Sequence, residues 1–391
     1  MDVDVTSTYL DHAATTSLHP EVFDAMRPWQ ETHFANPSGS HRAARVARQA
    51  VDEARETVAA CLGVNAGDVV FTGGGTESDN YAISGSVRSR KGVAVCSSIE
   101  HHAVLDPVLH HGGVTVSVTR NGQIDIDDLR QVLERITSSG ELVSVVSVMA
   151  VNNEVGSIND IAGVAAVVRE CAPRAWLHTD AVQAACWVDL SEITRHIDLL
   201  SLSAHKFGGP KGVGIMVVSN GATPEPLLLG GGQERGRRSG TIDVAGAVGA
   251  ATALKKTTSE RDETSQRVLL LRNELLDAVL QVEGVVETVS RDHTVPGIAH
   301  VCLRDLDSEA LLFMLDEADV YASAASACAS GAMESSHVLA ALGVPDDLRR
   351  GALRLSLGHS TTEGDIERAS REISRSIGLL RERRAARRQR V

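Results

Sequence analysis

The chain has 391 residues, of which 43% are hydrophobic, and can therefore bury a large core in roughly two domains. Its net charge of −13 argues against a nucleic-acid-binding body, and it contains no apolar run of about 18 residues and no signal-peptide pattern. Six cysteines without a CxxC pair fit reduced thiols, so we expect a cytoplasmic protein without a membrane partner.

Strands and helices alternate along the first two thirds of the chain. Helical patterns run over residues 20–32 and 40–61. Seven strands are then predicted, at 69–71, 93–96, 114–116, 143–149, 176–177, 199–202 and 213–218. Helical segments separate most of them, which predicts an α/β fold with a mostly parallel seven-stranded sheet between helices.

A long helical pattern over residues 241–281 leads the chain away from this sheet. Its polar middle, KKTTSERDETSQ, marks a candidate domain boundary near residue 255. Strands at 297–303 and 352–357, with helices at 308–318 and 362–388, then indicate a smaller α+β domain. We expect a large domain of residues 15–255 and a small domain of residues 1–14 and 256–391.

Asp180 and Lys206 each come where a short apolar strand ends, and open parallel sheets bind ligands at that edge. A lysine that forms a Schiff base with pyridoxal phosphate (PLP) needs a second group, usually a carboxylate, to keep the pyridine nitrogen protonated. Alternatively, Lys206 is a surface lysine and Asp180 caps a helix. The Ser-Ala-His run before Lys206 and the glycine-rich turn after it favour the cofactor site.

The segment FTGGGTE, residues 71–77, ends a strand and begins a helix. Backbone N–H groups of Gly75 and Thr76, with the Thr76 hydroxyl, could hold a phosphate at the positive end of that helix. A glycine-rich turn is weak evidence by itself. Together with Lys206, however, it makes Ser203 and His205 two further candidate phosphate donors.

His101 follows another predicted strand, where its ring could lie flat on the cofactor. The His pairs at 101–102 and 110–111 could also suggest a metal site, but they lie at opposite ends of a short helix and nothing completes a ligand set, so no metal is expected. Asn153 and Gln183 could donate to the phenolic oxygen of the cofactor. Turn chemistry is the alternative for each.

Cys328 lies in YASAASACASG, a segment with one aromatic residue and otherwise only small side chains. Such a segment cannot anchor a core, so its thiol is expected to be accessible, as a nucleophile must be. The alternative is a semi-buried structural cysteine, which is the commoner role of a free thiol.

Ten segments follow one another along the chain: YLDHAATT, ANPSGSH, GGTESDN, EHHAVLD, NNEVG, HTDAVQA, SAHKFGGPKGVG, GGGQERGRRSGT, SACASG and LRLSLGHSTTEGDIE. With them the chain resembles the NifS-type cysteine desulfurases, a branch of the PLP-dependent class V aminotransferase-like enzymes, from about residue 9 to 380. RSGT and SAC are similar to the first subgroup of these enzymes. The second subgroup also acts as selenocysteine lyases.

The resemblance implies a PLP-dependent fold type I homodimer with its sites at the subunit interface. It implies that L-cysteine becomes L-alanine and that sulfur passes through a persulfide on Cys328 to an acceptor protein, for iron–sulfur clusters or thiolated cofactors, tRNA or metabolites. The implied roles are the Schiff base for Lys206, the pyridine nitrogen for Asp180, ring stacking and proton transfer for His101, the ring oxygen for Asn153 and Gln183, the phosphate for Gly75, Thr76, Ser203 and His205, the partner subunit's phosphate for Thr241, and the substrate carboxylate for Arg354 with Asn153.

Three departures from the family pattern stand out. Ala324 and Ala325 replace a usual glycine before Ser-Ala-Cys, and Asp243 stands where many members have Asn or Pro. The chain ends in the Arg-rich RERRAARRQRV, where iron–sulfur members continue into a segment that docks a scaffold protein. The rival interpretations are a selenocysteine lyase or aminotransferase on the same scaffold, and an interaction protein that has lost its activity.

Overall fold

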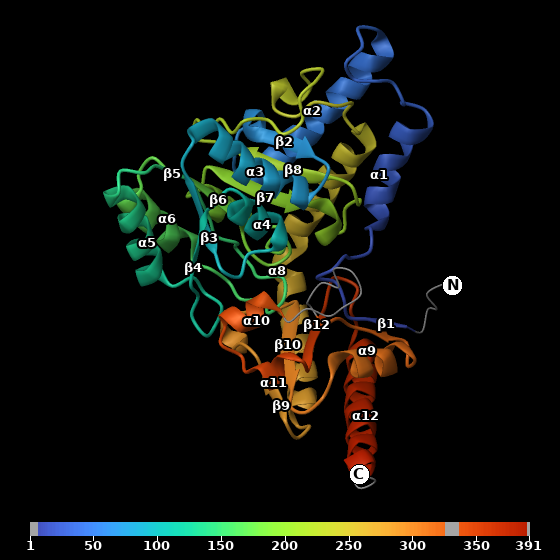
Figure 1. Ribbon diagram of the computed structural model, residues 1–391. Coiled ribbons are helices and arrows are strands. Elements are labelled where there is room, and N and C mark those ends of the chain that lie inside the picture. The colour runs from blue at the N-terminus through green and yellow to red at the C-terminus, as the bar shows by residue number, and fades with distance from the viewer. Residues whose placement is uncertain (1–6, 325–335, 389–391) are drawn as a thin grey trace.

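The computed structural model describes residues 7–324 and 336–388. Its larger part is built on a seven-stranded sheet in the order β2-β8-β7-β6-β5-β3-β4 (Figure 1). β8 is antiparallel to both of its neighbours, and the other neighbouring pairs are parallel, which confirms the predicted sheet. The strands are β2 (Val69–Thr72), β3 (Val93–Ser97), β4 (Val114–Val116), β5 (Val143–Ser147), β6 (Trp176–Asp180), β7 (Leu199–Ser203) and β8 (Gly214–Val218).

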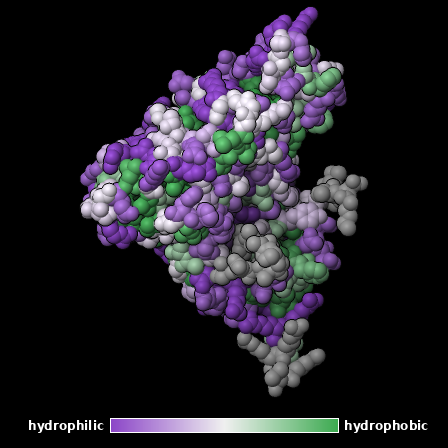
Figure 2. All heavy atoms as spheres, turned by 45° about the horizontal axis from the view of Figure 1, so that its top comes forward, coloured by the Kyte–Doolittle hydropathy of each residue, from purple (hydrophilic) through white to green (hydrophobic). Residues whose placement is uncertain are grey.

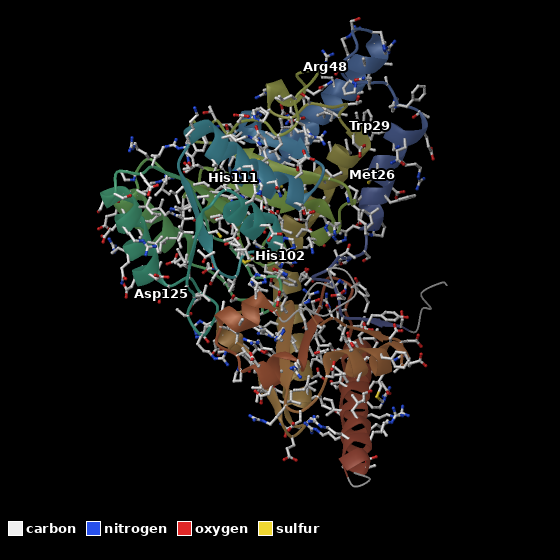
Figure 3. The ribbon with its side chains drawn as sticks, in the orientation of Figure 1. Met26, Trp29, Arg48, His102, His111 and Asp125 are labelled. Carbon is white, nitrogen blue, oxygen red and sulfur yellow. The ribbon has the colours of Figure 1, made fainter. Side chains whose placement is uncertain are left out.

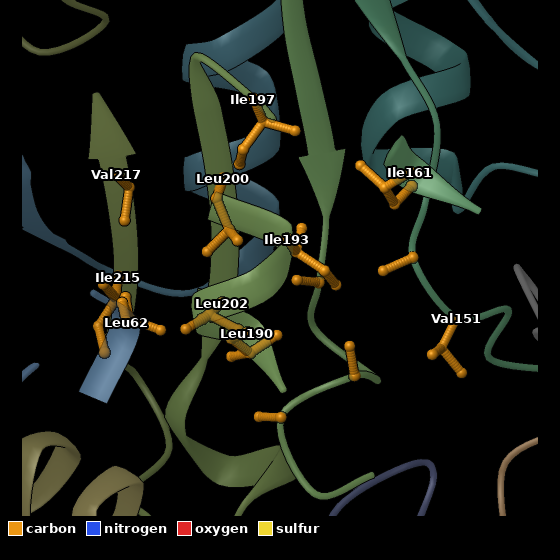
Figure 4. Close-up of a cluster of buried hydrophobic side chains, with 14 of the residues drawn as sticks. Leu62, Val151, Ile161, Leu190, Ile193, Ile197, Leu200, Leu202, Ile215 and Val217 are labelled. Atoms are coloured by element: carbon orange, nitrogen blue, oxygen red, sulfur yellow. The ribbon is translucent and has the colours of Figure 1, made fainter. Parts of the chain in front are cut away.

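Helices cover both faces of this sheet, because its strands carry apolar side chains toward both faces. Leu200 and Leu202 of β7 pack into the largest apolar cluster, whereas Leu199 packs into a separate cluster with Met216 of β8. Figure 4 shows Leu200 and Leu202 with Leu62 from a helix of the same cluster. The helices of this part are α1 (Pro20–Glu31), α2 (Arg42–Leu62), α3 (Gly75–Arg90), α4 (His102–His110), α5 (Ile126–Ser138), α6 (Ile161–Cys171) and α7 (Leu190–Thr194).

The long helix α8 (Val244–Leu280) connects the larger and the smaller part (Figure 1). Asp243 is its N-cap and accepts a hydrogen bond from the backbone N–H of Gly246 at 2.9 Å, which gives this departure from the family pattern a physical role. Gly249 lets α1 approach closely, since a Cβ there would lie 2.6 Å from Sδ of Met26, labelled in Figure 3.

The smaller part contains a three-stranded antiparallel sheet in the order β12-β10-β9. A parallel pair of short strands, β1 and β11, brings the N-terminal segment to this part. Its strands are β1 (Thr8–Tyr9), β9 (Val285–Glu287), β10 (Ile298–Leu303), β11 (Val320–Tyr321) and β12 (Ala352–Ser356), and its helices are α9 (Ser308–Asp316), α10 (His337–Ala341), α11 (Asp346–Arg349) and α12 (Glu363–Arg388).

Two separate apolar clusters divide α8 between the two parts. The segment 244–254 packs in the cluster of the large sheet, whereas the segment 268–279 packs with Leu10, β10 and β12. This distribution supports a division near residue 255, with the N-terminal segment in the smaller domain. The domain assignment of residues 15–255 against 1–14 and 256–391 remains a proposal.

The surface in Figure 2 is mostly hydrophilic, and one strand ends earlier than the sequence predicts. Hydrophilic side chains cover most of the face in Figure 2, with apolar side chains in smaller groups among them. β5 ends at Ser147, earlier than predicted, and the backbone N–H of Met149 donates instead to the Glu100 carboxyl at 2.7 Å. Within the described ranges, no helix is long and apolar enough to cross a membrane.

Candidate active site

A cavity of about 470 Å³ opens where the strands of the large sheet end and the smaller part begins, a volume typical of small-molecule sites. It is also lined by Ala13, Ala14, Asp79, Met149, Val182 and Ser323. It brings together ten predicted site residues: Gly75, Thr76, His101, Asn153, Asp180, Gln183, Ser203, His205, Lys206 and Arg354.

Asp180 is the last residue of β6 and is 5% exposed. Its carboxylate accepts a hydrogen bond from the backbone N–H of Val182 at 2.8 Å. Burial raises the pKa of Asp180, while the charges of His101 and Lys206 oppose that rise. A buried carboxylate that has a lysine beside it and a backbone N–H donor is suited to hold a protonated ring nitrogen.

Two further carboxyl groups, those of Asp79 and Glu100, are buried close to Asp180. Burial, and then the charge of Asp180, raises the pKa of each well above its usual value. His178 lies beside Asp79 with Nε2 to Oδ1 at 3.7 Å, and burial lowers its pKa to about 3, so it supplies no positive charge. Both shifts favour the neutral acid, whereas Asp180 accepts a backbone hydrogen bond that favours its charged form.

Lys206 follows β7 and donates from Nζ to the backbone carbonyls of Ala13 at 2.5 Å and Ala14 at 2.9 Å. Burial lowers its pKa to about 8, helped by the charge of Arg354 and opposed by that of Asp180. A lysine with such a pKa has a substantial uncharged fraction near neutral pH. It can therefore act as a nucleophilic amine.

The N-terminus of α3, the predicted phosphate cradle, lines the cavity with Gly75 and Thr76. A Cβ at Gly75 would lie 2.9 Å from Cγ2 of Val182, so the close packing of this first turn requires glycine. Ser203 lies at the end of β7, and Nδ1 of His205 is 3.1 Å from Oγ1 of Thr15. Burial lowers the His205 pKa to about 4, so this ring is an uncharged hydrogen-bonding group near neutral pH.

His101 caps α4, since its Nδ1 accepts a hydrogen bond from the backbone N–H of Ala103 at 3.1 Å. Its pKa is lowered by burial and raised by Asp180. The neutral ring therefore carries its proton on Nε2. The next residue, His102, is labelled in Figure 3 on the side of the large part that faces α10, and its ring lies 4.8 Å from that of His337.

The remaining predicted residues have different positions. Nε2 of Gln183 donates to the carbonyl of Ala13 at 2.7 Å. Thr241 is exposed and does not line this cavity. Cys328 lies outside the described residues. Within the described ranges, no group of three or more His, Cys, Asp or Glu residues could hold a metal ion.

Some contributors were not predicted from the sequence. Asp79 lies inside GGTESDN, and Ala13 and Ala14 lie inside YLDHAATT, but these segments had been given other roles or none. The signal available for Asp79 is its position one turn into a helix that begins at the glycine-rich segment. The two alanines act through backbone carbonyls, which leave no side-chain signature in a sequence.

The chain matches the aminotransferase class-V family over residues 8–369 and belongs to that family. The family is PLP-dependent, and the cavity fits this cofactor with a buried carboxylate, an amine of lowered pKa and a glycine-rich helix N-terminus.

Relatives within this family are named as cysteine desulfurases. The chain is 41% identical over 387 residues to an IscS-like cysteine desulfurase of Mycobacterium tuberculosis, covering 95% of this chain and 97% of the relative. It is 38% identical to the cysteine desulfurase IscS of Dictyoglomus turgidum, with 95% of each covered.

Solved structures agree with this comparison. A NifS-like protein has a TM-score of 0.89 at 31% identity, covering 96% of this chain and all of that one. SspA in complex with cysteine has a TM-score of 0.77 at 31% identity, covering 90% of this chain and 99% of that one.

Proposed function

We propose that the protein is a cysteine desulfurase that converts L-cysteine to L-alanine and takes the sulfur as a persulfide on Cys328. The observation that carries the proposal is the convergence of Lys206, Asp180 and Arg354 on one cavity in a chain whose full-length relatives are cysteine desulfurases. An amine, a carboxylate and a guanidinium are the groups needed to bind the cofactor and an α-amino acid.

In this proposal Lys206 binds the cofactor covalently, and Asp180 holds its ring nitrogen protonated. Gly75, Thr76, Ser203 and His205 bind the phosphate, and Asn153 and Gln183 bind the ring oxygen. PLP, when bound, accepts the electron pair released at the substrate α-carbon. His101 would lie over the ring. Either the Lys206 amine or His101 would remove the α-proton, and a proton would be returned to the product.

Arg354, with Asn153, binds the substrate carboxylate in this proposal. The Cys328 thiolate then attacks the substrate sulfur, the carbon–sulfur bond breaks, and the carbon chain leaves as alanine after protonation. The extra sulfur stays on Cys328 as a persulfide until an acceptor takes it. Sulfur is therefore transferred without release of free sulfide during the first half of the reaction.

Substitution of Cys328 by serine tests the assignment. The variant should keep its yellow colour and bind L-cysteine, while sulfide release falls to background, because a hydroxyl cannot take up sulfur. Mass spectrometry of the wild type after L-cysteine and before reductant should place 32 mass units, about one sulfur atom, on the Cys328 peptide. Cys171→Ser, at a half-exposed thiol, is the matched control and should stay active.

Retained alanine formation in Cys328→Ser, or sulfur on one of the other cysteines, would contradict the assignment. Selenocysteine lysis and transamination on the same scaffold are distinguished by the same experiment. Both retain Lys206 and Asp180 but make no persulfide on Cys328 from L-cysteine.

We also propose a homodimer in which Thr241 completes the phosphate site of the partner subunit. An exposed Thr241 that does not line its own cavity supports this role, as do Phe34 and Leu229, which are 79% and 82% exposed. Two ion pairs hold the loop before Thr241: Arg55 with buried Glu234, and Arg238 with Glu77 beside the cradle. A monomer in sedimentation that retains PLP and activity would rule out the shared site.

We propose that the sulfur acceptor is a protein thiol in the cytoplasm. It would act in iron–sulfur cluster assembly or in thiolation of cofactors, tRNA or metabolites. The relatives named IscS support the first pathway. The Arg-rich C-terminal helix α12 is partly held by its own chain, since Arg384 pairs with Asp305 at 3.1 Å. Transfer of ³⁵S from loaded enzyme to purified candidate acceptors would identify the pathway.

A further inference from the structure

The guanidinium of Arg354 is oriented from two sides. Arg354 lies on β12 and is 5% exposed. Its Nη2 donates to Oδ1 of Asp11 at 2.7 Å, and its Nη1 donates to the backbone carbonyl of Asn153 at 2.8 Å. Its Nε is buried and has no hydrogen-bond partner among the described residues. Nη1 and Nη2 each carry a second N–H group, and since Arg354 lines the cavity, these are the donors that an incoming carboxylate can meet.

Asp11 is itself fixed by the backbone. It forms a parallel bridge with Ser356, two residues beyond Arg354 on the same strand. Its carbonyl accepts hydrogen bonds from the Tyr9 hydroxyl at 3.1 Å and from the N–H of Ala14 at 3.0 Å. The turn that places this carboxylate also places the Ala14 carbonyl against Lys206, so Asp11 connects the arginine with the lysine side of the cavity.

Asp11 is the carboxylate paired with Arg354. None of the other titratable neighbours described below forms an ion pair with this guanidinium. His300, the cross-strand partner of Arg354, has its pKa lowered to about 3 by burial and stays neutral. Burial raises the pKa of Glu154, whose carboxyl is bonded to Ser336. Burial also raises the pKa of Tyr9, which remains a neutral phenol.

We propose that Asp11 is a positioning residue for amino-acid recognition: it holds the Arg354 guanidinium so that the remaining N–H groups meet the substrate carboxylate, and it offsets the positive charge beside Lys206. The inference rests on the proposed function, in which Arg354 binds that carboxylate. In support, the charge of Asp11 raises the pKa of Lys206, whereas that of Arg354 lowers it.

The test compares two amines that differ by one carboxylate. PLP-loaded wild type and Asp11→Asn are titrated with L-alanine and with ethylamine, and binding is followed by the change in cofactor absorbance. The dissociation constant for L-alanine should rise roughly tenfold, as expected for loss of a hydrogen bond to a charged group, and that for ethylamine should change less than about twofold. Asp277→Asn, which breaks the Arg291–Asp277 pair on the surface, is the control and should change neither.

A second measurement separates positioning from folding. The pH midpoint of the lysine-bound cofactor's visible band should fall in Asp11→Asn, because the Arg354 charge is then uncompensated. If Asp11→Asn does not fold, Asp11→Glu replaces it: the longer side chain should weaken L-alanine binding about threefold and spare ethylamine.

Three outcomes have distinct meanings. Unchanged L-alanine binding in a folded variant, or an equal loss for ethylamine, would overturn the role of Asp11. If only Asp11→Glu folds, unchanged L-alanine binding or an equal loss for ethylamine in that variant would likewise overturn the role of Asp11. A wild type that binds L-alanine no more tightly than ethylamine would instead refute Arg354 as the carboxylate site, whereas the desulfurase activity itself is decided by the Cys328 experiment.

Discussion

The two walls of the cavity are built in different ways. The wall with Asp180 and Lys206 comes from the ends of adjacent strands, β6 and β7, of one sheet. The wall with Arg354 is assembled from β12, the N-terminal segment at Asp11 and the turn at Asn153, which are far apart in the sequence. The first wall depends on one sheet register, whereas the second depends on three segments meeting at the boundary between the two parts.

This difference separates two kinds of chemistry. On the sheet wall, burial shifts pKa values strongly, and we propose that the cofactor is activated there. On the assembled wall, the carboxylate of Asp11 and the backbone carbonyl of Asn153 orient the Arg354 guanidinium. We propose that the substrate is selected there. Substitutions on the sheet wall should therefore remove the reaction, and substitutions on the other should change its specificity.

The largest effect is expected for Lys206→Ala. Without this amine the protein cannot bind the cofactor covalently, so the visible absorption band and activity should both disappear. Absorption spectra, and borohydride reduction followed by peptide mapping, check this result. A reducible lysine adduct that persists in the variant would show that another lysine bears the cofactor. Lys256→Ala, at a surface lysine paired with Glu260, should remain yellow.

Asp180→Ala should reduce activity by at least about 100-fold and weaken PLP retention, because the ring nitrogen loses a preorganised charge. Asp79→Asn is the matched comparison. If Asp79 is protonated, as its raised pKa indicates, the neutral amide should be tolerated within about tenfold. Turnover and cofactor content per subunit measure both. Near wild-type turnover in Asp180→Ala would remove this residue from the mechanism.

The sheet wall was predictable from the sequence because period and position suffice there. A buried strand that ends in a charged residue gives Asp180 its place, and the glycine-rich turn from strand to helix gives Gly75 its place. The seven-stranded sheet followed from the same alternation. The strand ends were less certain, since Met149 bonds to a side chain from another element.

The assembled wall was only partly predictable. Arg354 was assigned through family resemblance, but its pairing with Asp11 spans 343 residues and has no local signal. The carbonyls of Ala13 and Ala14 likewise depend on where a turn lies in space and not on side-chain type. Long-range ion pairs and backbone acceptors therefore cannot be predicted from residue type and spacing alone.

A pH experiment can show how the two walls are coupled. Burial and the charge of Arg354 hold the Lys206 pKa at about 8, and only the uncharged amine attacks the cofactor aldehyde. In cofactor-free protein, the rate of PLP uptake should therefore rise about tenfold per pH unit below the midpoint near 8 and then level off. Arg354→Gln should move the midpoint to higher pH, because a cation that disfavours protonation is gone. Stopped-flow absorbance checks the direction, and an unmoved midpoint would show that the walls act independently.

The smallest effect is expected at Ser336, which supports the assembled wall beside Asn153. Its Oγ caps α10 by accepting from the N–H of Leu339 at 3.1 Å, and it donates to Oε2 of buried Glu154 at 2.6 Å. Ser336→Ala should lower the free energy of unfolding by about 1 kcal/mol through loss of the cap. Urea unfolding of the PLP-loaded protein measures this loss, and Ser374→Ala on α12 is the control.

The pH dependence of that loss identifies its second component. Burial raises the folded-state pKa of Glu154 above its unfolded value, while the bond from Ser336 lowers it. Without Ser336 the folded pKa rises further, so above the unfolded pKa the folded protein retains a proton that the unfolded chain releases, and stability falls as pH rises. The destabilisation should therefore be larger at pH 8 than at pH 4. An equal loss at both pH values would mean that Ser336 acts on the helix alone and that Glu154 draws no stabilisation from it.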